Sequence, residues 1–320
     1  MRVVVVDPSR PVLDFIERLL ATRNHEVRTF VDPGEALEFV RSDPHVGAVI
    51  TSDELRPVSE MSGIELCWEV RLLATCRRPI YIILMSCDRD PKKLIEALDS
   101  GADDFIGKPP AAEELYARLR SAERLANMQQ ELLRLALTDP LTGVLNRRAF
   151  FERAAEACGR APELTALSAV VIDIDHFKRI NDVYGHDIGD TAIRKVAEEI
   201  AAERATIGRL GGEEFAMLLE ARDLDGAVAI ADALRARISR LEVHPQYESL
   251  RLTCSFGLSE WEAGDTIDRL LKRADIALYS AKSGGRNRVA AFHRDLIDAV
   301  DYGTVSGRLR GAGRGASQTS

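Results

Sequence analysis

Acidic residues follow short apolar runs in the second half of the chain, where their spacing suits phosphate chemistry. One apolar run ends at Asp173, and two adjacent glycines precede Glu213 and Glu214 between two further apolar runs. Adjacent glycines allow the positive φ of a hairpin turn and let the backbone approach a ligand closely. The glutamates would repel each other, and a divalent cation between Glu213 and Asp173 would relieve that repulsion. The pattern predicts a metal site for nucleotide phosphates, with an exposed acidic turn as the alternative.

Four more polar residues could bind the rest of such a nucleotide. A glycine-rich turn between Asn181 and Asp190 leads into an amphipathic pattern, which places these two side chains near each other. An amide carbonyl and a carboxylate match the N1–H and N2–H₂ donors of guanine, so a guanine preference is predicted. Lys282 and Arg286 lie four residues apart near a helix end and could hold β- and γ-phosphates as a point charge and a fork. Taken alone, such a cationic pair is more often solvated surface.

The elements that must position these residues alternate between helical and strand patterns. We expect helices over 145–158, 188–202, 224–241 and 267–280, and strands over 169–174, 207–210, 215–219, 252–258 and 288–292. The order predicts an α/β domain with an antiparallel hairpin around its two adjacent glycines.

Five sequence blocks in this region together resemble the GGDEF family of diguanylate cyclases. They are Asp139-Pro140-Leu141-Thr142, Leu145-Asn146-Arg147-Arg148, the block from Asp173 to Asp190, Gly211 to Phe215, and Ala274 to Asn287. The resemblance covers residues 138–293 and implies a palm-like cyclase domain. It further implies condensation of two GTP into cyclic di-GMP and two pyrophosphates.

The same resemblance implies a role for each matched residue. Asp173, Glu213 and the backbone carbonyl of Ile174 would bind Mg²⁺, or Mn²⁺ in its place, with up to two ions per half-site. Glu213 would also accept a proton, with Glu214 alongside, and Lys178 would stabilise charge in the transition state. The remaining residues would bind substrate: Asn181, His186 and Asp190 around guanine, and Lys282 and Arg286 at the terminal phosphates.

One domain holds one GTP by these residues, so a homodimer is expected to bring two half-sites together across a two-fold axis. Many relatives carry an RxxD inhibitory site before the hairpin. Here Ala202 and Ala205 occupy its two positions, so no product inhibition is expected through that site. The alternative functions are a catalytically inactive regulator that binds GTP or cyclic di-GMP, and a signalling scaffold.

The first half of the chain predicts a different domain with its own acidic site. Strands are expected over 3–6, 27–30, 48–52, 80–85 and 104–106, with helices over 11–20, 33–40, 64–73, 91–99 and from 111. Continuous apolar strands alternating with helices indicate a doubly wound five-stranded parallel sheet. Its carboxyl-terminal edge would gather Asp7, Asp53, Ser86 and Lys108, a set suited to a divalent cation and a phosphoryl group.

These residues, with Lys108-Pro109 and with Pro57 four positions after Asp53, resemble a response-regulator receiver domain over 1–120. By that resemblance a sensor histidine kinase would phosphorylate Asp53, with Mg²⁺ bound nearby. Ser86 and Lys108 would contact the phosphoryl group, and Phe105 would be the aromatic switch. Pro8 stands where the family usually has a second acidic metal ligand. The alternative is a pseudo-receiver that serves only in dimerisation.

A long helix is predicted to join the two domains over 111–137. Leu125, Met128, Leu132 and Leu135 recur at 3-4-3 spacing, which is typical of a short coiled coil. Pairing with a second copy is favoured because the helix exceeds what the first domain needs. Packing against its own domain is the alternative.

Composition narrows the remaining classes of function. The net charge of −8 argues against nucleic-acid binding, which needs clustered cations to displace counterions. The longest apolar runs are strand-length, so neither a membrane span nor a signal peptide is expected. The five scattered cysteines are typical of reduced thiols in a cytoplasmic protein. Residues 302–320, rich in Gly, Ser and Arg, are predicted to be a disordered tail.

Overall fold

The computed structural model describes residues 1–320 except 24, 57, 89, 164–165, 244–249 and 297–320. The chain divides into two compact units, Met1–Ala136 and Leu137–Ser320, and each is described by itself. Both the predicted tail and Pro57 lie outside the described residues.

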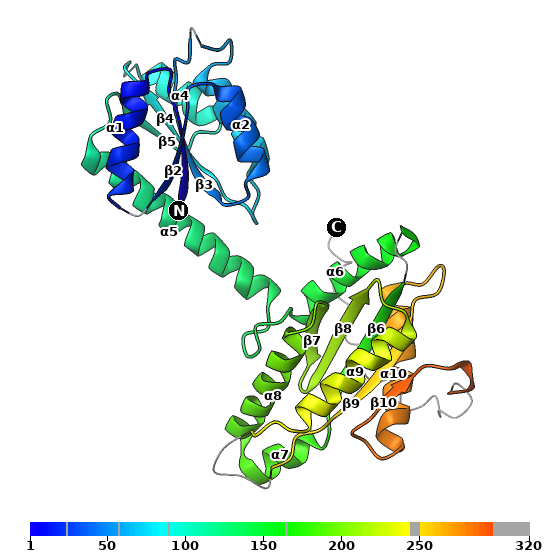
Figure 1. The fold of residues 1–320 in the computed structure, drawn as a ribbon. Coiled ribbons are helices and arrows are strands. Elements are labelled where there is room, and N and C mark those ends of the chain that lie inside the picture. The colour runs from blue at the N-terminus through cyan, green and yellow to red at the C-terminus, as the bar shows by residue number, and fades with distance from the viewer. Residues whose placement is uncertain (24, 57, 89, 164–165, 244–249, 297–320) are drawn as a thin grey trace, which may run out of the picture. The chain divides into compact units, whose positions relative to one another are not determined.

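The first unit is a parallel five-stranded sheet with helices on both faces (Figure 1). Its strands follow the order β2-β1-β3-β4-β5, and all their pairings are parallel. The strands are β1 (Arg2–Val6), β2 (Glu26–Phe30), β3 (Val46–Ser52), β4 (Tyr81–Ser86) and β5 (Asp104–Gly107). The helices are α1 (Arg10–Ala21), α2 (Pro33–Ser42), α3 (Gly63–Leu73), α4 (Pro91–Asp99) and α5 (Ala112–Leu137). The predicted doubly wound fold is therefore confirmed.

Alternate residues of each strand point to opposite faces, which explains the continuous apolar runs. In β1, Val4 and Val6 pack with residues of α2 and α3, whereas Val3 and Val5 pack with residues of α1 and α5. All four valines are fully buried. The sheet is thus covered on both sides, and its polar chemistry is confined to the strand ends.

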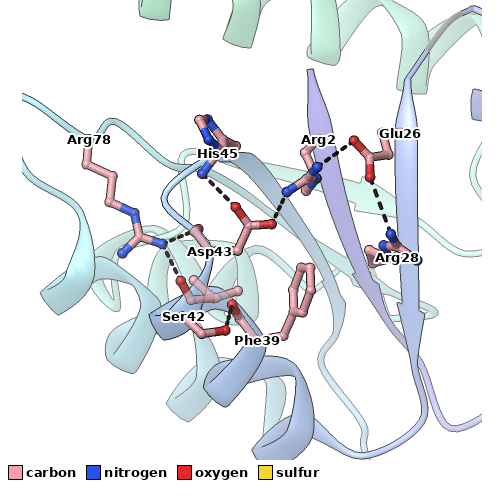
Figure 2. A network of polar contacts seen from close by, with 9 residues as sticks. Arg2, Glu26, Arg28, Phe39, Ser42, Asp43, His45 and Arg78 are labelled. Atoms are coloured by element: carbon pink, nitrogen blue, oxygen red, sulfur yellow. Dashed lines mark hydrogen bonds and ion pairs between the residues drawn. The ribbon is translucent and has the colours of Figure 1, made fainter.

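A network of ion pairs and hydrogen bonds joins the amino-terminal ends of β1 and β2 to the loop after α2 (Figure 2). Arg2 bonds Asp43 and also reaches Glu26 at 2.8 Å. Arg78 donates to the backbone carbonyl of Asp43 at 2.7 Å. These contacts lie at the opposite edge of the sheet from Asp7 and Ser86. They hold the strands together there and do not involve the acidic edge.

Helix α5 has a buried part followed by an exposed apolar stripe. Leu115, Leu119 and Ala122 are buried, and the first two pack in the core of the first unit. Further along, Leu125, Met128, Leu132 and Leu135 are 44 to 64 % exposed. The first part of the helix therefore packs into the core of its own unit, and coiled-coil pairing of the stripe stays a prediction.

The second unit is a mixed five-stranded sheet, again between two helical layers (Figure 1). In the strand order β10-β9-β6-β8-β7, the central β6 runs antiparallel to both β8 and β9. The strands are β6 (Leu167–Ile174), β7 (Thr206–Gly211), β8 (Glu214–Glu220), β9 (Cys254–Glu260) and β10 (Val289–Ala291). The helices are α6 (Arg147–Arg160), α7 (Phe177–Tyr184), α8 (His186–Ala201), α9 (Leu224–Ile238) and α10 (Ile267–Ser283), with short 3₁₀ turns at Ala161–Glu163 and Arg294–Leu296. The predicted α/β domain with an antiparallel hairpin is confirmed.

Helices α8 and α9 cover one face of this sheet, and α6 and α10 cover the other. Helix α10 lies very close to β9, because a Cβ at Gly257 would come within 2.1 Å of the carbonyl oxygen of Ala274. Only glycine allows that approach. It fixes α10, and with it Lys282 near the helix end.

Some local features differ from the sequence expectations. The helix expected over 224–241 ends at Ile238, and the strand expected over 252–258 is β9, Cys254–Glu260. Helix α7 was not predicted, because its eight residues offer only two turns of helical pattern before Gly185 breaks it at φ 84°. Helix α6 begins at Arg147 instead of Leu145. There Leu145 forms a bridge with Gly208 of β7, and the Asn146 side chain caps the helix by accepting from the Ala149 N–H.

Candidate nucleotide site and phosphoacceptor site

Asp173 lies at the end of β6 and is only 5 % exposed. Its carboxylate forms an ion pair with Lys282, with Nζ 2.6 Å from Oδ2. The pKa of Asp173 is raised to about 6, chiefly by burial and also by the carboxylates of Glu213 and Glu214, against the lowering effect of Lys282. The site therefore concentrates negative charge in a poorly solvated place, which a cation would stabilise.

The glycine pair forms the tip of the β7–β8 hairpin beside this carboxylate. Gly211 and Gly212 adopt φ values of 154° and 50°, and a Cβ at either would meet nothing within 4 Å. The carbonyl of Glu213 accepts from the Ile174 N–H at 3.4 Å, and Glu214 stands opposite Asp173 in the strand register. The hairpin thus brings both glutamates to the end of β6 while leaving its tip open to a ligand.

The donor set suits an ion that a nucleotide helps to bind. Among the described residues, no group of three or more His, Cys, Asp or Glu side chains could hold a metal. Mg²⁺ commonly takes one or two protein carboxylates and completes its shell with substrate phosphates and water. Asp173 and Glu213, with the backbone carbonyl of Ile174 at the end of β6 as a further oxygen, fit that mode of binding.

Asn181 carries an unsatisfied polar atom next to helix α8. Its Oδ1 is buried and has no hydrogen-bond partner among the described residues. A Cβ on Gly189 would lie 1.9 Å from this oxygen, so the glycine before Asp190 makes room for it. An unpaired buried carbonyl costs about 1–3 kcal/mol. A ligand donor such as the N–H of guanine would remove that cost. Half-buried Asp190 and exposed His186 lie on the same helix.

The three predicted cationic residues differ in their surroundings. Lys282 is paired with Asp173, which the sequence did not indicate, because its expected partner was phosphate. Arg286 is exposed in the turn after α10, at a left-handed φ of 61°. Lys178 is exposed on α7. The structure thus brings Lys282 to the acidic cluster directly and leaves the other two facing solvent.

Arg209 of β7 connects the hairpin to the segment where the second unit begins, and sequence reasoning missed it. Its Nε donates to the Gly212 carbonyl at 2.8 Å, and its Nη1 lies 3.0 Å from Oδ1 of Asp139. Arg147 reaches the Leu210 carbonyl at 3.3 Å. The segment after α5 is therefore bonded to the strand that leads into the hairpin tip.

At the acidic edge of the first unit, the predicted residues converge. Ser86 donates to Asp53 at 2.6 Å, and Lys108 lies 2.5 Å from the fully buried Asp7. Lys108 also donates to Ser52 at 2.9 Å. Sequence reasoning missed Lys93, whose ammonium group lies 3.8 Å from Asp53. A helical surface lysine carries no signal that would have revealed it.

Pro8, which stands where receiver domains usually have a second acidic residue, affects this site. Pro8 brings no side-chain oxygen, and one oxygen of Asp7 accepts from the Ser9 N–H at 2.8 Å. Asp7 and Asp53 therefore remain as the carboxylates for an ion, which is fewer than the family pattern supplies. Phe105 is half-buried against the core on the α2–α3 face.

Comparisons with known proteins identify a family for each of the two parts of the chain. The model of the response regulator receiver domain matches residues 3–120, and that of the diguanylate cyclase GGDEF domain matches residues 136–288. The chain belongs to the response regulators that join a receiver domain to a GGDEF domain. The GGDEF domain is the second unit described above, and the receiver domain lies within the first.

Named relatives match more than half of this chain. The response regulator PleD of Caulobacter vibrioides is 37 % identical over 226 residues, which cover 66 % of this chain and 50 % of PleD. The diguanylate cyclase DgcP of Pseudomonas aeruginosa is 38 % identical over 55 % of this chain and 29 % of its own length. The chain thus spans half or less of these two relatives.

A solved structure is similar to the second part. It contains the coiled coil and GGDEF domain of DgcB from Caulobacter crescentus in complex with c-di-GMP. It is 35 % identical, has a TM-score of 0.50, and covers 55 % of this chain and 98 % of that one. Within the described part of this chain, every helix is too short or too polar to cross a bilayer.

Proposed function

We propose that this chain is an active diguanylate cyclase that condenses two GTP into cyclic di-GMP and two pyrophosphates. The observation that carries the proposal is the buried Asp173 beside an open Gly-Gly-Glu-Glu hairpin tip with both glutamates present. A chain that kept the fold only to bind a nucleotide would have no need for this costly concentration of acidic groups.

Each half-site would bind one GTP through the residues already placed. The unsatisfied Oδ1 of Asn181 would accept from guanine, with Asp190 and His186 nearby. Lys282 would leave Asp173 for the terminal phosphates, joined there by Arg286. When bound at Asp173, Glu213 and the Ile174 carbonyl, Mg²⁺ or Mn²⁺, with up to two ions per half-site, would stabilise charge on the attacking and leaving oxygens.

In the reaction, the 3′-oxygen of one GTP would bond to the α-phosphorus of the other. The bond from that phosphorus to the β-phosphate oxygen breaks, and pyrophosphate leaves. Glu213, with Glu214 alongside, would accept the proton of the 3′-hydroxyl, and Lys178 would stabilise the charge that develops on the phosphoryl oxygens. A second, equivalent attack closes the ring.

The residues above account for one GTP, so two copies of the domain must face each other. A homodimer would supply proximity and orientation, which lower the barrier of a two-substrate reaction strongly. The exposed stripe of Leu125, Met128, Leu132 and Leu135 on α5 is the surface we propose for pairing with the second copy. Dimer geometry would then set the rate.

The receiver domain would regulate this pairing. Asp53, bonded to Ser86 and near Lys93, would accept a phosphoryl group from a sensor histidine kinase. Phosphorylation would favour the active dimer through α5. Arg209 would carry the effect onward within the second unit, because it bonds both the segment after α5 and the hairpin tip.

The proposal is tested by incubating purified chain with GTP and Mg²⁺ and separating the products by chromatography. The Glu213→Ala variant should lose at least a hundredfold in rate, because it removes a metal ligand and a proton acceptor together. Glu198→Ala, which removes an exposed glutamate of α8, is the matched control and should keep wild-type activity. Equal activity in both variants would refute the site, and GTP binding without turnover would favour the inactive regulator.

A further inference from the structure

Asp175 is a buried carboxylate whose partners come from two distant segments of the chain. It follows β6 directly and is 5 % exposed. Thr253 and Ser255, at the start of β9, donate their hydroxyls to it at 2.8 and 2.7 Å. The backbone N–H of Asn287 donates to it at 3.0 Å. One side chain thus links the end of β6, β9 and the turn after α10.

That turn has an unfavourable backbone. Gly285, Arg286 and Asn287 adopt consecutive positive φ values of 117°, 61° and 46°. A left-handed conformation is costly for residues with a Cβ, so two of these three positions need outside support. Within the turn, the Arg286 N–H bonds the Ala281 carbonyl at 3.1 Å. At its far end the Asn287 N–H bonds Asp175, next to the bond from the Phe256 N–H of β9 to the Arg288 carbonyl at 2.9 Å.

The end of α10, just before the turn, is held by an ion pair of its own, which the reaction must break. Lys282 is held by Asp173 at 2.6 Å, and both groups are needed elsewhere once a metal–nucleotide complex binds. Asp175 has no such competing role, because its three donors all belong to the protein. It can therefore keep its bond to the turn throughout the reaction.

We propose that Asp175 is a positioning residue that holds the turn of residues 284–287, so that Arg286 stays aligned with the β- and γ-phosphates of GTP. The inference rests on the proposed function, since it assumes that this turn meets phosphate. Asp175 acts through the backbone of Asn287 and does not touch the nucleotide.

The test measures binding to the full chain by calorimetry at fixed Mg²⁺. The ligands are GMP and a GTP analogue with a methylene group between its α- and β-phosphates, which cannot release pyrophosphate. Asp175→Asn should weaken the triphosphate analogue about tenfold, the size expected for one lost bond to a charged acceptor. GMP lacks the phosphates that the turn would hold, so its affinity should change less than about twofold.

Two more variants separate positioning from general support of the fold. Ser255→Ala removes another bond of the same carboxylate without touching the turn, and its binding of the analogue should remain near wild type. Arg286→Ala should weaken the analogue, and adding Asp175→Asn to it should cost little more, because both changes remove the same interaction. The inference would be overturned if the two substitutions together lowered the affinity for the analogue by the product of their separate effects. It would also be overturned if Asp175→Asn weakened the binding of GMP and of the analogue equally.

Hydrogen exchange in the unmutated chain gives a readout that does not depend on the variants folding. The Asn287 amide should be protected, and its protection should persist when the analogue binds. Fast exchange of this amide in the bound state would overturn the inference. Failure of wild type to bind the analogue would overturn the proposed function as well, whereas wild-type binding with an unaffected Asp175→Asn variant would overturn only the role of Asp175.

Discussion

Replacing Arg209 with methionine should destabilise the GGDEF domain and slow its catalysis together. Methionine keeps much of the apolar stem and removes the guanidinium group. That group lies 3.0 and 3.2 Å from the two oxygens of Asp139 and 2.8 Å from the Gly212 carbonyl. Because one side chain bonds both ends of this connection, its loss should separate the start of the domain from the hairpin tip.

The magnitude follows from the burial of the pair. Breaking a fully buried ion pair costs about 3–5 kcal/mol, and an exposed pair contributes about 0–1 kcal/mol. The two side chains are 14 % and 18 % exposed, so the pair lies between these limits, at about 2 kcal/mol. The bond from a charged donor to Gly212 adds about 1 kcal/mol. We therefore expect Arg209→Met to lower the free energy of unfolding by about 3 kcal/mol.

Asp139→Asn is the matched variant, because it weakens the pair but leaves the bond from Arg209 to Gly212. It should destabilise the domain by about 1–2 kcal/mol and leave the rate near wild type. Arg209→Met should lower kcat/KM about tenfold, which corresponds to about 1.4 kcal/mol acting on the hairpin tip. Urea unfolding followed through Trp261, the tryptophan of this domain, measures stability, and pyrophosphate release measures the rate.

The pH dependence of the stability difference has a defined sign. Burial raises the pKa of Asp139, but bonds from Thr142 and Arg209 outweigh it and leave the pKa below its ordinary value of 3.8. A lowered pKa stabilises the fold above the ordinary value, and this contribution is lost as pH falls through the folded pKa. The difference in the free energy of unfolding between wild type and Asp139→Asn should thus be constant from about pH 8 to 5 and become smaller only in stronger acid. Wild-type stability and rate in Arg209→Met would refute the reasoning.

Three further predictions concern other parts of the chain. Gly189→Ala should weaken GTP binding at least tenfold while GGDEF-domain stability falls less, because its Cβ would come within 1.9 Å of Asn181 Oδ1 and displace that side chain; calorimetry and unfolding together check this. Asp53→Asn should abolish the increase in mass that acetyl phosphate produces in the wild-type chain. An unchanged increase in this variant would show that another residue is the phosphoacceptor. Cyclic di-GMP should not inhibit through the loop holding Ala202 and Ala205, so restoring Arg and Asp there should create inhibition that wild type lacks.

Local sequence patterns were sufficient for much of the fold, and they supplied the residues that are proposed to touch the nucleotide. Strands with continuous apolar runs, and glycines that need positive φ such as Gly212, leave a signal within a few residues. The supporting residues leave none. Arg209 and Asp139 are 70 positions apart, and Asp175 and Asn287 are 112 apart. Their roles arise only when the sheet brings distant strand ends together, so sequence reading missed them.

The pairing of Lys282 with Asp173 shows a different limit. Sequence motifs identified both residues but assigned them to different partners, a phosphate and a metal. A buried carboxylate takes the nearest available cation, and α10 is fixed closely enough to β9 to supply one. Motifs that describe contacts to a ligand do not contain this pairing within the protein.

The most direct measurement of the central claim is the identity of the product formed from GTP. The purified chain would be incubated with GTP and Mg²⁺, with and without acetyl phosphate, and the products would be analysed by chromatography and mass spectrometry. The account predicts cyclic di-GMP, with two pyrophosphates released for each molecule formed, and a higher rate after phosphorylation. Absence of cyclic di-GMP under both conditions, from folded chain that still binds GTP, would contradict it.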